Sequence, residues 1–176
     1  MRRQRDRRWP GVALTALVVL LGGIALGHRP APPAAPATSA ARTTDELRQR
    51  FDSAVLMLHA RQYEPAAAAL HRVLELAPML PDAHVNMGYA MLGLQRPAVA
   101  RDFFDGAIAL KADQVNAYYG LALAHEALGD LPMALGAMRS YLHLARGEKE
   151  SHLRRARAAL WEWEAQLGAQ REAAPR

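Results

Sequence analysis

The chain repeats itself every 34 residues, and this period restricts its fold more than any other feature of the sequence. Residues 47–80, 81–114 and 115–148 align without a gap. Each copy has an alanine at the same position, followed four residues later by a bulky apolar residue: Ala66 and Leu70, Ala100 and Phe104, Ala134 and Met138. Units of this length cannot bury their apolar faces alone. The period therefore predicts a solenoid of stacked units.

Each copy is predicted to form two helices of about a dozen residues joined by a short turn. The turns are expected at Arg61-Gln62-Tyr63, Gln95-Arg96-Pro97 and Gly129-Asp130. Beyond the repeats, apolar residues continue at spacings of three and four, which indicates one more helix over residues 149–168. This helix would cap the apolar face of the last repeat. The predicted fold is all-α.

The register resembles the tetratricopeptide repeat (TPR), whose pattern is W-x-x-L-G-x-x-Y, then A-x-x-x-F, then P. The clearest copy is the second, which carries His84, Met87, Gly88, Met91, Ala100 and Phe104 at the patterned positions. The sequence departs from the pattern in two ways: the tryptophan is absent, and only the first copy keeps its closing proline, Pro78. The resemblance covers residues 47–148. It implies a TPR-like solenoid of three helix-turn-helix repeats, with the capping helix behind them.

In the TPR family, the first helices of successive repeats line a concave groove that binds a peptide. Transferred register by register, the resemblance implies eight peptide-binding residues: Phe51, Val55, Val85, Asn86, Tyr89, Asn116, Tyr119 and Leu123. For Val55, Val85 and Leu123, packing between repeats is the alternative role. The rings of Tyr89 and Tyr119 are better suited to a ligand, since aromatic side chains supply large contact areas. We expect these two rings to contact mainly the ligand and to matter little for stability.

A groove that clamps two carboxylates, as in co-chaperone TPR domains, requires Lys or Arg at several groove positions. Here those positions hold Phe51, Val55, Asn116 and Gly120. The groove is therefore predicted to be apolar and aromatic, suited to an amphipathic helix or an extended apolar segment of another protein.

The N-terminus carries a separate signal. Residues 1–9 form a basic segment, and residues 10–27 form an uncharged apolar run. Eighteen helical residues span about 27 Å, which nearly crosses a bilayer core of roughly 30 Å. The run is either a transmembrane anchor or the apolar region of a signal peptide, and its length favours the anchor. Small-x-small cleavage sites at Ala25-Leu26-Gly27 and Thr38-Ser39-Ala40 leave a cleaved signal peptide as the alternative.

Charge predicts the topology and argues against one class of partner. Five arginines precede the apolar run, which predicts a single-pass inner-membrane protein with its N-terminus in the cytoplasm. The TPR domain would then lie in the periplasm if the organism is a Gram-negative bacterium. The net charge of +5 does not imply nucleic-acid binding, because residues 42–176 hold 16 basic and 16 acidic side chains, which cancel.

Residues 28–44 are rich in Pro and Ala and are predicted to be an extended linker to a TPR domain over residues 45–168. Residues 169–176 are predicted to be a disordered tail. The sequence contains no cysteine, no metal-binding His spacing and no Gly-rich phosphate loop. We therefore expect no catalytic residues, no cofactor and no metal.

These features together predict a membrane-tethered interaction scaffold that is not an enzyme. The layout resembles membrane-anchored bacterial TPR factors of c-type cytochrome biogenesis. An assembly factor for a pilus or secretion system, and a cleaved, soluble periplasmic adaptor, are the alternatives.

Overall fold

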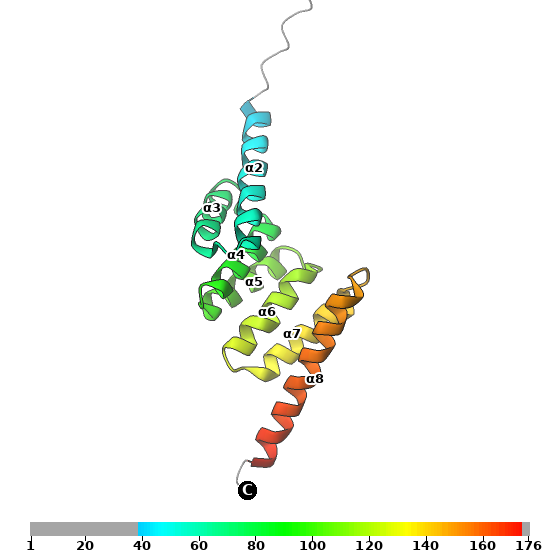
Figure 1. The fold of residues 1–176 in the computed structure, drawn as a ribbon. Helices are drawn as coiled ribbons and strands as arrows, with labels where there is room; N and C mark the ends of the chain where they lie inside the picture. The colour runs from blue at the N-terminus through cyan, green and yellow to red at the C-terminus, as the bar shows by residue number, and fades with distance from the viewer. Residues whose placement is uncertain (1–38, 174–176) are drawn as a thin grey trace, which may run out of the picture. The chain divides into compact units, whose positions relative to one another are not determined.

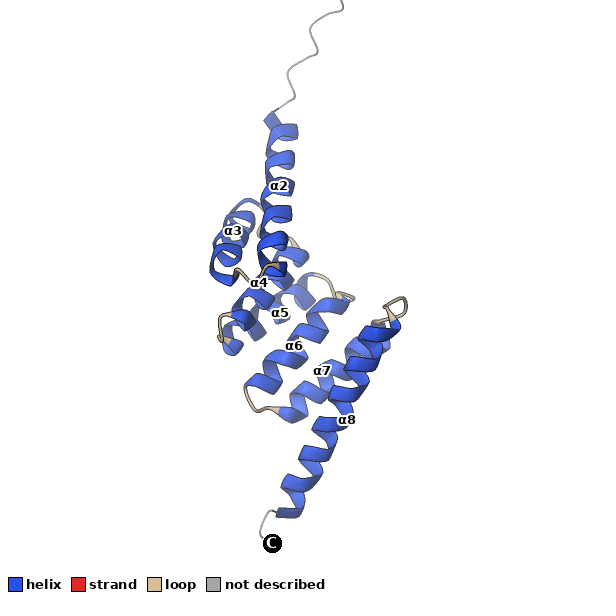
Figure 2. Cartoon of the chain, in the orientation of Figure 1, coloured by secondary structure: helices blue, strands red, loops and turns tan. Residues whose placement is uncertain are grey.

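The computed structural model describes residues 39–173, and within that range every regular element is a helix (Figures 1 and 2). The seven helices are α2 Ser39–His59, α3 Tyr63–Leu76, α4 Pro81–Gly93, α5 Pro97–Leu110, α6 Val115–Ala127, α7 Leu131–Leu144 and α8 Glu150–Ala173. Each helix packs against the next along the chain, and α4 also contacts α2 and α6. The predicted all-α solenoid of three helix pairs and a capping helix is therefore confirmed.

The turn inside each helix pair has one repeated geometry. Arg61, Gln95 and Gly129 stand 34 residues apart, and all three have left-handed backbones, with φ of 58°, 58° and 78°. The amide after each of them donates to the carbonyl five residues before it, as from Asp130 to His125. This is the Schellman arrangement, which satisfies carbonyls at the end of a helix. The three turns were predicted at these positions, although only the third has the glycine that favours such a backbone.

The core is organised around the small residues of the repeats. Phe104 is fully buried, and a Cβ atom at Gly88 would lie 2.6 Å from its ring. A Cβ atom at Gly120 would overlap the same ring. The Phe104 ring of α5 therefore occupies the space that glycines leave on α4 and α6. Gly88 therefore allows the close approach of the paired helices α4 and α5, and Gly120 allows that of α6 from the following repeat.

The capping helix is held by a tryptophan. Trp163 is 1% exposed, and its indole Nε1 donates a hydrogen bond of 2.7 Å to Glu126 Oε1 on α6. Figure 1 shows α8 following α7 at the C-terminal end of the stack. The prediction that the helix ends at Gly168 is wrong, because α8 continues to Ala173. One glycine costs a helix about 1 kcal/mol, and the good helix formers around it (Ala, Gln, Arg and Glu) offset that cost.

At the other end, α2 begins at Ser39, so residues 39–44, predicted to belong to the linker, are helical. The basic segment, the apolar run 10–27 and the rest of the linker lie outside the described residues. Between residues 39 and 173, no helix combines the length and the apolar character needed to cross a membrane.

Candidate functional site

A groove runs along the first helices of the three repeats. It encloses a cavity of about 770 Å³ lined from α2, α4 and α6, with further contributions from the start of α3 and the turn after α4. We define the groove by the residues that line this cavity: Val55, Leu58, His59, Tyr63, Asn86, Tyr89, Leu92, Gly93, Gln95, Asn116 and Leu123. The register of the repeats predicted that the first helix of each repeat lines the groove, and the lining residues agree with this prediction. The cavity lies in the range of about 300–1,000 Å³ usual for ligand sites.

Five of the eight residues predicted to bind a peptide line the groove: Val55, Asn86, Tyr89, Asn116 and Leu123. Two of these were also candidates for packing between repeats. Within residues 39–173, Val55 and Leu123 are half-buried and do not join the apolar side chains that pack against the core. They therefore present apolar surface to the groove.

The other predicted residues lie elsewhere. Val85 is 5% exposed and belongs to the core, so its packing role is the one that the structure supports. Phe51 is half-buried against the core and lines neither the groove nor the second cavity described below. Tyr119 lines that second cavity.

The tyrosines are more firmly built into the fold than the sequence suggested. The Tyr89 hydroxyl donates a hydrogen bond of 2.9 Å to the Asn116 carbonyl, and its ring meets Phe104 edge-on at 5.1 Å between centroids. The Tyr119 ring lies 5.1 Å from that of Tyr141. The expectation that Tyr89 and Tyr119 contact mainly a ligand is therefore wrong. Alanine at either position would also remove packing within the protein.

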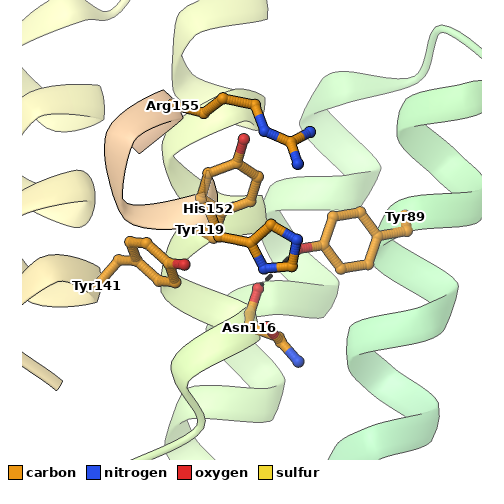
Figure 3. A pocket seen from close by; sticks show the side chains of 6 residues that line it. All are labelled: Tyr89, Asn116, Tyr119, Tyr141, His152 and Arg155. Atoms are coloured by element: carbon orange, nitrogen blue, oxygen red, sulfur yellow. Dashed lines mark hydrogen bonds between the residues drawn. The ribbon is translucent and has the colours of Figure 1, made fainter. Parts of the chain in front are cut away.

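A second, smaller cavity of about 210 Å³ adjoins the groove at the capping helix, and we call it the α8 pocket. Its six lining residues come from α4, α6, α7 and α8, as Figure 3 shows: Tyr89, Asn116, Tyr119, Tyr141, His152 and Arg155. Tyr89 and Asn116 line both cavities, so the α8 pocket continues the groove.

Burial raises the pKa of the Tyr89 hydroxyl above its ordinary value, and the neighbouring Tyr119, Tyr141 and Glu148 add to the effect. Burial also raises the pKa of Tyr141, again with a contribution from Glu148. Both hydroxyls therefore stay protonated at neutral pH and can donate hydrogen bonds. Tyr89 already donates to the Asn116 carbonyl.

Sequence reasoning missed Tyr141, His152 and Arg155. The repeat period does not fix the register of α8, because this helix follows the last repeat and is not a copy of one. Tyr141 did leave a signal, since the equivalent positions in the earlier repeats hold Val73 and Ala107. A tyrosine at a core position that is small or aliphatic in the earlier repeats indicates that the third repeat packs against the capping helix and not against a fourth repeat.

The described residues hold no group of three or more His, Asp or Glu side chains arranged to bind a metal ion. His125 is 7% exposed, and its Nδ1 lies 4.0 Å from an Asp130 carboxylate oxygen. The chemistry that the site offers is that of hydrogen bonds, apolar contact and one guanidinium group.

No protein-family model and no curated protein matches the sequence. Solved structures do match. The chain is similar to the first TPR domain of Spaghetti (RPAP3) bound to an HSP90 peptide, with 21% identity, a TM-score of 0.64 and coverage of 70% of this chain and 94% of that one. It is also similar to PcrH in complex with the chaperone binding region of PopD, with 20% identity, a TM-score of 0.65 and coverage of 70% and 94%.

A third similar structure is the type III secretion chaperone SycD of Yersinia enterocolitica with a peptide of the translocator YopD. It has 14% identity and a TM-score of 0.64, with 69% of this chain and 95% of that chain covered. At such identities these similarities concern the fold. Residues 39–173 have the fold of a TPR domain.

Proposed function

We propose that this protein is a membrane-tethered scaffold, and not an enzyme, that binds a peptide or helix segment of a partner protein in its groove. The observation that carries the proposal is the groove itself. Three successive first helices line it, and Val55 and Leu123 present apolar side chains to it without packing against the core. Such a surface suits an amphipathic helix or an extended apolar segment.

Two further observations support the proposal. Each of the three similar TPR structures described above holds a peptide or a region of another protein. The groove also offers polar groups beside its apolar ones, since the Asn86 amide lines it between α2 and α6. The Asn86 side-chain nitrogen donates to the Asp82 carbonyl one turn earlier, which fixes the amide and leaves its oxygen for a ligand.

Membrane tethering and the periplasmic location belong to the same proposal and rest on the sequence of residues 1–27. The apolar run would anchor the chain, and the arginines before it would keep the N-terminus in the cytoplasm. We place the protein in the assembly or maturation of an envelope complex, such as that of c-type cytochromes. A pilus or secretion-system factor and a cleaved periplasmic adaptor are the competing proposals.

Site-specific photo-crosslinking tests the groove. A benzoylphenylalanine at Asn116, which is exposed and lines the groove, should give a discrete adduct in cells. The control position is Ala109 on α5, which is also exposed but does not line the groove. Mass spectrometry of the Asn116 adduct would identify the bound segment. Adducts that form equally from Ala109, or from neither position, would contradict the proposal.

The topology has its own test. A reporter enzyme that is active only in the periplasm, fused after Arg176, should be active. The purified protein should retain its N-terminal residues and stay with membranes after a carbonate wash. Activity of a cytoplasmic reporter alone would overturn the orientation. A mature N-terminus at His28 or Ala41 would instead identify the cleaved adaptor.

A further inference from the structure

We propose that the α8 pocket binds a carboxylate group of the segment that occupies the groove. This inference rests on the proposed function and adds a polar subsite to it. Of the four clamp positions, only Asn116 lines the pocket, and the other three, Phe51, Val55 and Gly120, do not; none of the four carries a positive charge in this chain. Among the pocket's six described lining residues, the only fixed cation is Arg155, on the capping helix.

The pocket is rich in hydrogen-bond donors and lacks acidic groups among its six lining residues. Among residues 39–173, the Tyr119 and Tyr141 hydroxyls have no hydrogen-bond partner, and the Asn116 side-chain amide has none either. The Tyr141 side chain is largely buried, but its hydroxyl is not sealed from solvent and is open to a partner that enters the pocket. A carboxylate accepts several hydrogen bonds at once and would satisfy these donors together.

Arg155 supplies the charge. Within the described part of the chain no carboxylate lies within ion-pair distance of its guanidinium group, whereas Arg157 on the same helix pairs with Glu150 at 3.1 Å. The Nε atom of Arg155 donates weakly to the Ser151 carbonyl at 3.4 Å. The two terminal nitrogens remain available, and this end of a guanidinium group binds carboxylates with two parallel hydrogen bonds.

Among the described residues, Glu148 is a negative group that lies near the pocket. Glu148 interacts electrostatically with both Tyr89 and Tyr141, but its carboxylate pairs with His152 Nδ1 at 3.2 Å. This contact directs the Glu148 carboxylate to His152, and Arg155 keeps its charge without an ion-pair partner among the described residues. Glu148 therefore weakens the binding of an anion without preventing it, and its removal should strengthen binding.

Size and position argue for part of a longer ligand. The volume of about 210 Å³ falls below the roughly 300–1,000 Å³ of sites for whole small molecules. The pocket shares Tyr89 and Asn116 with the groove, so a segment in the groove can reach it. The carboxylate can come from the C-terminus of the partner or from an Asp or Glu side chain. Three tyrosine rings could also surround a cation, but Arg155 would repel one.

The test is a nuclear magnetic resonance titration of the full chain, observed at the Arg155 Nε–H group and the tyrosine rings. Four probes are compared: N-acetyl-alanine, its amide, N-acetyl-aspartate α-amide and tetramethylammonium. We expect saturable shifts with N-acetyl-alanine, with N-acetyl-aspartate α-amide, or with both, which identifies the source of the carboxylate. We expect no saturable shift with the neutral amide or with the cation.

Two variants and a matched control sharpen the result. Arg155→Gln should weaken carboxylate binding about tenfold or more, because it removes a charged hydrogen-bond donor. Glu148→Gln should strengthen it. Arg154→Gln, at an exposed neighbour that does not line the pocket, should leave it unchanged. Equal binding of the acid and the amide, preference for tetramethylammonium, or an unaffected Arg155→Gln variant would overturn the inference.

The outcome is separable from that of the proposed function. If a partner crosslinks at Asn116 and the carboxylate probes do not bind, the groove function stands and the α8 pocket inference fails. If the probes bind through Arg155 and no partner crosslinks at Asn116, the α8 pocket is a carboxylate site, but the scaffold function fails and with it a groove-bound segment as the source of the carboxylate.

Discussion

Replacing Phe104 by alanine should lower the free energy of unfolding by about 3–5 kcal/mol. The side chain is fully buried, and its ring fills the space between Gly88 and Gly120. Truncation removes apolar contact and leaves a cavity that two glycines cannot fill. Urea unfolding of the full chain, followed by circular dichroism, measures the effect. Typical domains are stable by only 5–15 kcal/mol, so the loss would be a large fraction of the total.

The neighbouring Phe103 is the matched control. It is half-buried, and its nearest ring contact is a tilted one with His84 at 6.0 Å between centroids. Phe103→Ala should therefore cost clearly less than Phe104→Ala. Equal losses from the two variants would mean that Phe104 does not hold the repeats together.

Gly120→Ala should destabilise the protein by about 1–3 kcal/mol, although alanine favours helices more than glycine does. The added methyl group would overlap the ring of Phe104, which is fully buried. Gly136→Ala is the control, because Gly136 is exposed on α7 and a Cβ atom there meets nothing within 4 Å. That change should stabilise the protein by about 0.5–1 kcal/mol. Thermal and urea unfolding would show the opposite signs.

A double-mutant cycle isolates the contact. In the Phe104→Ala background, the methyl group of Gly120→Ala enters the cavity, so the second change should be neutral or stabilising. The coupling should be within the 0.5–3 kcal/mol seen for residues in direct contact. Additive effects would show that Gly120 and Phe104 do not share this space.

The repeat period predicted most of the fold because it determines both the helices within each unit and the way that successive units stack. Positions such as Ala66, Ala100 and Ala134 recur in register, and all three are fully buried. The turn positions were equally regular, and the structure gives Arg61 and Gln95 the left-handed backbone that Gly129 adopts. The period gives no information about where a helix outside the repeats ends. The prediction that α8 ends at Gly168 was wrong for this reason.

The candidate site divides in the same way. Register placed Val55, Asn86 and Leu123 on helices whose relative positions follow from the repeat. The register could not decide whether Val85 lines the groove or packs in the core. Which positions of a helix are buried depends on how its partner helices pack against it. Arg155 and Tyr119 line the same pocket only because α8 packs against the end of the stack. No periodic pattern carries that information.

The most direct test of the groove is the affinity of the crosslinked segment, made as a synthetic peptide, for three lysine variants. Val55→Lys and Leu123→Lys place a charge in the groove, and Leu56→Lys changes the adjacent side chain, which is 69% exposed and lines no described cavity. We predict affinities at least about tenfold weaker for the two groove variants, with unchanged urea unfolding and an unchanged affinity for Leu56→Lys. Equal affinities for all three variants and the wild-type protein would contradict the assignment of this groove as the binding site.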